Sequence, residues 1–408
     1  MNALENKSQV NRLAGLFACT YMVSYITRIN YGTVISEMET ATAISRELLS
    51  LALTGSFITY GVGQIISGVL GDRVSPKKLV SWGLIVTVLM NFLIPVCRNT
   101  FQMVAVWCVN GFAQSFLWPP LVRLMTALLS EEDYKKTTAK VLWGSSFGTI
   151  LIYLVSPLII SVLSWKWVFV FSAVCGVVML WIWNRYSYEI ETTEQTPAAK
   201  EPKGQRTPLW SPLMIGIMAA IILQGMLRDG VTTWMPSYLS ETYRLSNRIS
   251  ILTGVVLPLF SIVCSQIATR LHMKKLTNPL TCAGVFFAAG ACSALVLWLL
   301  AGQSAVFSVL LSATLTGCMH GVNLMLICMI PPYFKTYGTV STVSGVINSC
   351  TYIGSALSTY GIAVLSKEIG WHYTVLVWFL VALAGTVLCV SCAKPWKHKF
   401  PARQSDPI

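Results

Sequence analysis

The stretch GVLGDRVSPKKL, residues 68–79, has a counterpart in SQIATRLHMKKL at residues 265–276. In this register Arg73 matches Arg270, and a lysine pair closes both stretches. Two weaker pairs occur in the same order along the chain: TRINYGT at 27–33 with LRDGVTT at 227–233, and SWKWVF at 164–169 with GWHYTV at 370–375. Because three pairs recur in one order, the sequence predicts two copies of a single structural unit.

Apolar segments dominate both copies. Of the 408 residues, 54% are hydrophobic and 11% are charged, whereas about 25% of the residues in a soluble domain are charged. The apolar runs approach the roughly 20 residues that a helix needs to cross a bilayer, and a helix satisfies its own backbone there. We predict an all-α polytopic membrane protein with twelve transmembrane helices, at 13–34, 49–71, 79–97, 101–129, 139–163, 167–186, 211–239, 250–269, 277–301, 304–331, 340–365 and 371–392.

The net charge of +13 is distributed as in a membrane protein, which argues against nucleic-acid binding. With the N-terminus inside, most lysines and arginines fall in cytoplasmic segments. We therefore expect both termini in the cytoplasm and the protein in the cell (inner) membrane. The polar, proline-containing segment between the sixth and seventh spans reads as a linker. The expected domains are a six-helix bundle at 1–186, a cytoplasmic linker at 187–210, and a second six-helix bundle with a short cytoplasmic tail at 211–408.

The repeated stretch at 68–79 resembles the signature loop of the major facilitator superfamily. The matching residues are Gly68, Asp72, Arg73, Lys77 and Lys78. The resemblance implies two six-helix bundles, a substrate site near the bilayer midplane, and a loop that latches the halves on the cytoplasmic side. Asp72 can accept hydrogen bonds from basic groups and helix N-termini. The second copy has Thr269 instead, so we expect a weaker latch there; topology alone would also explain the lysines.

The segment WCVNGFAQSFLWPPLVRLM at 107–125 narrows the resemblance. Its pattern W-x-x-N-G-x-x-Q-x-x-x-W-P-P is similar to that of the organophosphate:inorganic phosphate antiporters, which include glycerol-3-phosphate and hexose-phosphate transporters and the glucose-6-phosphate translocase. The segments at 28–32, 141–148 and 227–239 resemble the first, fifth and seventh helices of that family. The resemblance implies a secondary transporter that exchanges an organic phosphate for inorganic phosphate by alternating access.

By the same resemblance, two phosphate-binding arginines fall on Arg28 and Arg228. An arginine at mid-helix costs about 2.5–3.5 kcal/mol on insertion scales. Two guanidinium groups that converge on one phosphate would meet its oxygens bidentately and roughly match a dianion. The structural alternative is an internal ion pair with Asp229, the acid that we place in the membrane. Adjacent helix residues do not share a face, so Asp229 need not pair with Arg228 and could instead pair with Arg28 or Arg123.

Three positions depart from the family pattern. Ile29 and Gln64 stand where the family has lysines, and Phe147 stands where glycerol-3-phosphate carriers have a histidine. The substrate could therefore be an anion of lower charge or with another organic tail. We expect the site to be completed by polar and aromatic side chains within the spans: Tyr25, Tyr31, Gln64, Trp118, Trp143, Asp229, Trp234, His320, Asn323, Asn348 and Tyr352. Packing or interfacial anchoring would explain the aromatic residues equally.

Three functions stay open: exchange of an organic phosphate for inorganic phosphate, proton-coupled symport of an organic carboxylate or another anion, and sensing of a sugar phosphate without transport. Proton coupling usually needs a titratable group in the pathway, for which Asp229 and His320 qualify.

The twelve cysteines form no metal-binding pattern. We see no nucleophile–base pair or phosphate-cradling glycine loop, so we expect no enzymatic activity. We also expect a monomer without a cofactor.

Overall fold

The computed structural model describes residues 6–42, 44, 46–187, 209–245, 253 and 256–400. Within these residues the chain is helical and contains no strand. It forms two compact units. Unit 1 lies within Met1–Thr207 and Phe334–Ser349, and unit 2 lies within Pro208–Tyr333 and Cys350–Ile408. Apart from its end residues, the expected linker at 187–210 falls outside the described residues, and its role stays a prediction.

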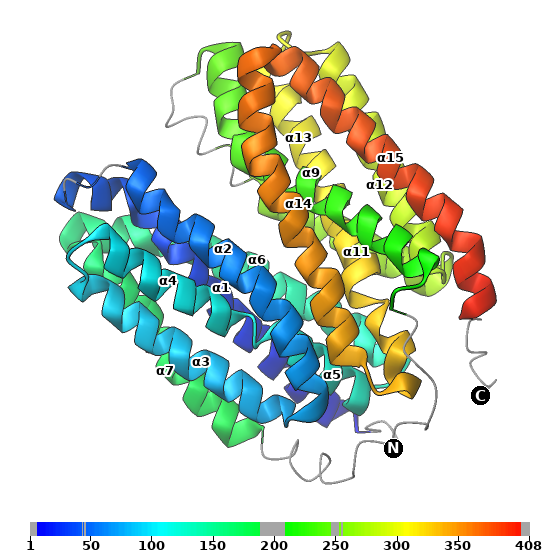
Figure 1. Cartoon of the computed structure of the whole chain (residues 1–408), viewed down its shortest axis with the longest axis horizontal. Coiled ribbons are helices and arrows are strands. Elements are labelled where there is room, and N and C mark those ends of the chain that lie inside the picture. Colours follow the sequence, from blue (N-terminus) through cyan, green and yellow to red (C-terminus); the bar gives the residue numbers. More distant parts are fainter. Residues whose placement is uncertain are drawn as a thin grey trace. The chain divides into compact units, whose positions relative to one another are not determined.

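In the described residues, unit 1 contains seven complete α-helices and one short 3₁₀ turn, together with the end of η3 (Pro331–Tyr337) and the first part of α14 (Val340–Glu368) (Figure 1). Inside this unit, α1 packs along α6 and α7, and α2 packs along α4. The elements are α1 (Lys7–Thr42), α2 (Arg46–Arg73), α3 (Pro76–Leu93), η1 (Ile94–Val96), α4 (Thr100–Gln114), α5 (Trp118–Leu128), α6 (Glu131–Val162) and α7 (Lys166–Tyr186).

The expected span at 101–129 is two helices. α4 ends at Gln114 and α5 begins at Trp118, directly before Pro119 and Pro120. Proline has no backbone N–H and fits the first turn of a helix, so the double proline restarts the helix instead of continuing it. The side chain of Asn99 accepts a hydrogen bond from the backbone N–H of Gln102 and caps the start of α4.

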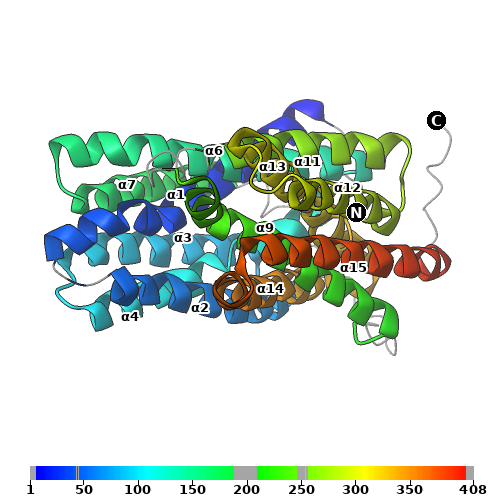
Figure 2. The ribbon, with the colours of Figure 1, turned by 90° about the horizontal axis from the view of Figure 1, so that it is seen from above.

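Unit 2 contains α9 (Pro212–Tyr243), α11 (Val256–Lys274), α12 (Pro279–Leu299), α13 (Ala305–Asn323) and α15 (Gly370–Lys399), together with the later part of α14 (Val340–Glu368). Helices α11, α12 and α13 lie side by side (Figure 2), and α9 packs on α13 and α15. After α13 the chain forms a π-helical turn, η2 (Leu324–Cys328), and a 3₁₀ segment, η3 (Pro331–Tyr337). The expected span at 304–331 is therefore irregular at its end.

Apolar side chains cover the outer faces of many helices. Val162 is 82% exposed and Leu158 is 68% exposed, both on α6. Within the described residues, nine helices are long and apolar enough to cross a membrane. Helices α1, α4, α5 and α14 are not among the nine. Helices α4 and α5 have only 15 and 11 residues, because the chain breaks between them. A helix with so much exposed apolar surface matches a lipid environment.

Candidate functional site

Arg28 lies on α1, half-buried, against two aromatic rings. Its guanidinium carbon is 4.3 Å from the ring centroid of Tyr25 on the same helix and 4.9 Å from that of Tyr60 on α2. Such cation–π contacts contribute about 0.5–2 kcal/mol. A ring engages the face of a guanidinium, so this seat is compatible with bidentate donation from the edge of Arg28 to an anion.

The backbone of α1 next to Arg28 is held by buried amide side chains. Asn91 on α3 and Asn110 on α4 both donate to the carbonyl of Thr27, at 3.1 and 3.3 Å. Gln114 on α4 donates to the hydroxyl of Thr27 at 2.8 Å and accepts from Ser24 at 2.8 Å. All five side chains are buried. Because buried polar groups are costly when unpaired, this network fixes α1 one residue before Arg28.

The remaining residues of the W-x-x-N-G-x-x-Q motif on α4, Trp107 and Gly111, also make close packing contacts. The Trp107 ring centroid lies 5.1 Å from that of Tyr31 and 5.7 Å from that of Phe169, and a Cβ at Gly111 would meet the carbonyl of Ser56 on α2. Tyr31 is fully buried in this core, and its hydroxyl donates to the carbonyl of Leu49 at 3.3 Å. The structure thus gives Tyr31 the packing role that the sequence had left open.

Sequence reasoning used Asn110 and Gln114 only as family markers and missed the network that they form. A signal for it was present, because an amide side chain in an apolar helix needs a hydrogen-bond partner. The identity of the partner, a backbone carbonyl on α1, follows only from the packing of α3 and α4 on that helix.

Asp72 joins the end of α2 to the start of α14 inside unit 1. Its two carboxylate oxygens accept from the backbone N–H groups of Ser341 and Thr342, at 2.9 and 2.7 Å. These are first-turn donors without a partner in their own helix, and a negative charge there is favourable. A Cβ on Gly68 would meet the carbonyl of Ser341, so glycine permits the close approach.

Other members of the expected latch are arranged differently. Arg73 and Lys78 are exposed, as a purely topological role would require. Lys77 is 9% exposed, and its carbonyl accepts from the indole N–H of Trp183 at 3.4 Å. In the second copy, the hydroxyl of Thr269 donates to the carbonyl of Ser265 in its own helix, at 2.9 Å.

Arg123 on α5 binds the C-terminal end of α2. Its Nη1 donates to the carbonyl of Gly71 and, at 3.4 Å, to that of Val74. A cation at the last carbonyls of a helix is favourable. The structure therefore shows a capping role for Arg123 at the end of α2.

Gln64 and Asn348, two expected site residues far apart in sequence, meet in unit 1. The Nδ2 of Asn348 on α14 donates to Oε1 of Gln64 on α2 at 3.1 Å, and Nε2 of Gln64 donates to the carbonyl of Ser115 at 3.5 Å. Both side chains are buried.

Two expected site residues are tryptophans of unit 1. Trp118 is 2% exposed and Trp143 is half-buried; among the described residues neither indole N–H has a hydrogen-bond partner.

Arg228 on α9 is paired with its neighbour in sequence, contrary to our expectation. Its Nε and Nη2 donate to the two carboxylate oxygens of Asp229, at 2.7 and 2.8 Å. The rule that adjacent residues face apart concerns Cβ directions; a guanidinium on a long flexible stem can fold back along its own helix. Nη1 of Arg228 also donates to Oδ1 of Asn323 on α13 at 3.1 Å.

Two further side chains complete this cluster in unit 2. Ser355 on α14 donates its hydroxyl hydrogen to Asp229, and His320 on α13 interacts electrostatically with Arg228 and Asp229. Asn323 contacts Arg228 directly, and His320 lies three residues before it on α13, a spacing that places both on one face of the helix. Trp234 on α9 and Tyr352 on α14 are half-buried in the same unit.

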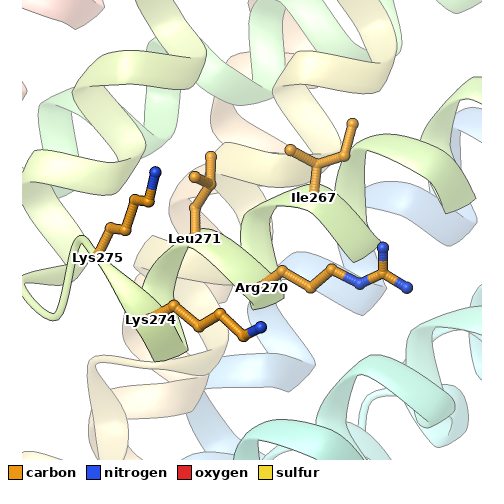
Figure 3. Close-up of a pocket in the computed structure, with 5 residues that line it drawn as sticks. All are labelled: Ile267, Arg270, Leu271, Lys274 and Lys275. Atoms are coloured by element: carbon orange, nitrogen blue, oxygen red, sulfur yellow. The ribbon is translucent and has the colours of Figure 1, made fainter.

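A surface pocket lies along α11 in unit 2. Figure 3 shows Arg270 and Lys274 extending in the same direction from the helix, and the lining comprises Ile267, Arg270, Leu271, Lys274 and Lys275. None of these is an expected substrate-site residue. Across the part of the chain that the structure describes, no group of three or more His, Cys, Asp or Glu could hold a metal ion.

The model of the Major Facilitator Superfamily matches residues 17–359. The membrane sensor protein UhpC of Salmonella typhimurium is 23% identical over 383 residues, which cover 87% of this chain and 84% of that protein. The glycerol-3-phosphate transporter of Bacillus subtilis is 25% identical, with coverage of 87% and 85%. A probable hexose phosphate transport protein of Chlamydia muridarum is 26% identical, with coverage of 39% and 35%. The predicted resemblance to the organophosphate:phosphate antiporter family is confirmed.

Solved structures agree on the fold. The proton:xylose symporter XylE matches with a TM-score of 0.74 at 12% identity, covering 97% of this chain and 96% of that one. The transporter FucP matches with a TM-score of 0.71 at 13% identity, with coverage of 94% and 99%. The predicted fold class is confirmed. These relatives and structural neighbours are transporters and a membrane sensor, and none of them is an enzyme.

Proposed function

Because the chain belongs to the major facilitator superfamily, we propose that it carries a small organic phosphate across the cell (inner) membrane in exchange for inorganic phosphate, by alternating access. The observation that supports the proposal is the pair of cation–π contacts that Arg28 makes with Tyr25 and Tyr60. The two rings engage the face of the cation, and its position is the one at which the family resemblance implies a phosphate ligand.

Magnitudes support an anionic ligand for Arg28. Cation–π contacts contribute about 0.5–2 kcal/mol, whereas an arginine at mid-helix costs about 2.5–3.5 kcal/mol on insertion scales. The two ring contacts therefore offset part of the cost. A phosphate dianion bound to the fork of Arg28 would lower the cost further through charge-assisted hydrogen bonds.

We assign the second phosphate contact to Arg228, whose Nη1 reaches the neutral amide of Asn323. The organic part of the substrate would contact the remaining candidates: Gln64, Trp118, Trp143, Trp234, His320, Asn348 and Tyr352. Ile29 and Gln64 in place of family lysines lower the number of cations, which suits an anion of lower charge or one with another organic tail. The protein acts as a monomer with both termini in the cytoplasm.

Two relatives favour different functions. The glycerol-3-phosphate transporter supports transport, whereas UhpC is described as a membrane sensor and favours phosphate recognition without transport. Proton-coupled symport would use Asp229 or His320, both of which belong to unit 2.

One experiment separates these functions. Proteoliposomes are preloaded with glycerol-3-phosphate or a hexose phosphate, and uptake of labelled inorganic phosphate is measured with and without an uncoupler. An exchanger takes up label in both conditions and only when preloaded. Uptake that the uncoupler abolishes would establish symport, and binding of phosphate without any uptake would establish a sensor.

A further inference from the structure

We propose that Asp229 is an internal competitor for the transported anion: it occupies Arg228 when the site is empty and must release it when the anion binds. The inference rests on the proposed function, because it assumes that Arg228 binds substrate. It reverses the simplest expectation for an acid in a binding cluster, which is that removing it weakens binding.

The geometry of the pair imitates anion binding. Asp229 meets Nε and Nη2 of Arg228 with its two oxygens, at 2.7 and 2.8 Å, which is the fork-to-fork arrangement by which arginine also holds a phosphate. The side chains of Arg228 and Asp229 are 16% and 32% exposed. The pair is thus mostly withdrawn from solvent, where charge-assisted hydrogen bonds are strongest.

Both edges of the guanidinium are engaged. Asp229 takes the edge formed by Nε and Nη2, and on the other edge Nη1 donates to Asn323 at 3.1 Å. An anion that takes the edge formed by Nε and Nη2 must therefore displace the carboxylate. An anion that binds at the Nη1 side instead still lies beside the negative charge of Asp229 and is repelled. Asp229 weakens anion binding by either route.

Neighbouring helices hold the competitor in place. Ser355 on α14 donates a hydrogen bond to Asp229, and Gln224, one turn before Arg228, ties α9 to the carbonyl of Met319 on α13 at 3.1 Å. The carboxylate is thus positioned rather than free to rotate away. In such an arrangement the apparent dissociation constant equals the intrinsic one divided by the fraction of molecules in which the arginine is released.

The test is the affinity of the purified full-length protein for inorganic phosphate, measured by titration calorimetry, together with its melting temperature without ligand. Asp229→Asn keeps the shape of the side chain and removes its charge. We expect the affinity to rise roughly tenfold to a hundredfold, the range set by hydrogen bonds to charged groups. The melting temperature should fall, because Arg228 loses its ion-pair partner.

Two variants serve as comparisons. Ser355→Ala leaves the carboxylate in place but removes one of its hydrogen bonds, so affinity should rise by a smaller factor. Glu241→Gln removes an acid from the same helix, where Glu241 accepts from the indole of Trp371 at 2.7 Å. It is the charge-matched control, and phosphate affinity should stay unchanged.

An unchanged or lower affinity in folded Asp229→Asn protein would overturn the inference. If that variant does not fold, Ser355→Ala decides in the same way. Arg228→Ala separates this failure from failure of the proposed function. If Arg228→Ala binds phosphate as tightly as the native protein, Arg228 is no ligand and the assignment itself is wrong. If Arg228→Ala loses phosphate binding while neither Asp229→Asn nor Ser355→Ala strengthens it, Arg228 is a ligand and only the proposed competition by Asp229 is wrong.

Discussion

The two repeated segments place an arginine at matching positions, Arg28 and Arg228, but surround it with different chemistry. The described contacts of Arg28 are with the uncharged rings of Tyr25 and Tyr60. Those of Arg228 include a carboxylate that meets it with both oxygens. One residue makes much of the difference, because Arg28 is followed by Ile29 and Arg228 by Asp229. The two repeated segments therefore keep the arginine and differ in the residue that follows it.

Substitution of the two arginines by lysine tests this difference most directly. Arg28→Lys and Arg228→Lys keep the charge but replace the planar fork by a compact ammonium. Each should lose about 1.5–3 kcal/mol of phosphate binding, or roughly tenfold to hundredfold in affinity. Only Arg228→Lys should also lower the melting temperature without ligand, because it disrupts the pair with Asp229. Ligand-induced thermal stabilisation of the purified variants measures both effects.

Near-native phosphate-induced shifts in both lysine variants would refute the binding assignment. In that case a depressed melting temperature for Arg228→Lys alone would mark Arg228 as a packing residue. Val162→Ala is a suitable control, since Val162 is 82% exposed on α6 and belongs to no expected site.

The supports of the two arginines differ as well. Gln114 bonds both Ser24 and Thr27 on α1, whereas Gln224 makes one bond, to the carbonyl of Met319. Gln114→Leu leaves two buried hydroxyls without this partner and should destabilise the protein by about 1–3 kcal/mol. The loss should exceed that of Gln224→Leu, measured by denaturation in mixed detergent, and equal losses would show that the two amides are equivalent supports.

Much of the fold could be predicted from residue pattern alone. The apolar runs and the repeat around Arg73 and Arg270 indicate the helices and their duplication, and the prolines at 119 and 120 contain the signal for the break in the fourth span. The pairing of Arg228 with Asp229 could not be predicted in this way. It depends on the rotamer of a long side chain and on Asn323 and Ser355, which approach from other helices.

The repeated loops offer a third comparison. Asp72 accepts two backbone N–H groups at the start of α14, while Thr269 bonds only its own helix. Asp72→Asn removes the charge at a helix N-terminus and should cost about 1–2 kcal/mol of stability. Thr269→Ala should change stability by no more than about 0.5 kcal/mol. Thermal denaturation of both variants measures this difference between the two loops. If Thr269→Ala loses as much stability as Asp72→Asn, the two loops contribute equally and the comparison is wrong.

The smallest predicted change in phosphate affinity concerns the aromatic contacts of Arg28. Tyr60 is 3% exposed, and its ring lies 4.9 Å from the guanidinium carbon. Tyr60→Leu removes a contact worth about 0.5–1 kcal/mol and should weaken phosphate binding two- to fivefold, while Tyr60→Phe keeps the ring and should bind as the native protein does. Tyr153→Leu is the control, because Tyr153 is 50% exposed on α6. If Tyr60→Phe and Tyr60→Leu weaken binding equally, the hydroxyl matters and the ring does not. Arg28 would then be positioned by the network at Thr27, and the difference between the two arginines would lie in the buried amides rather than in the aromatic seat.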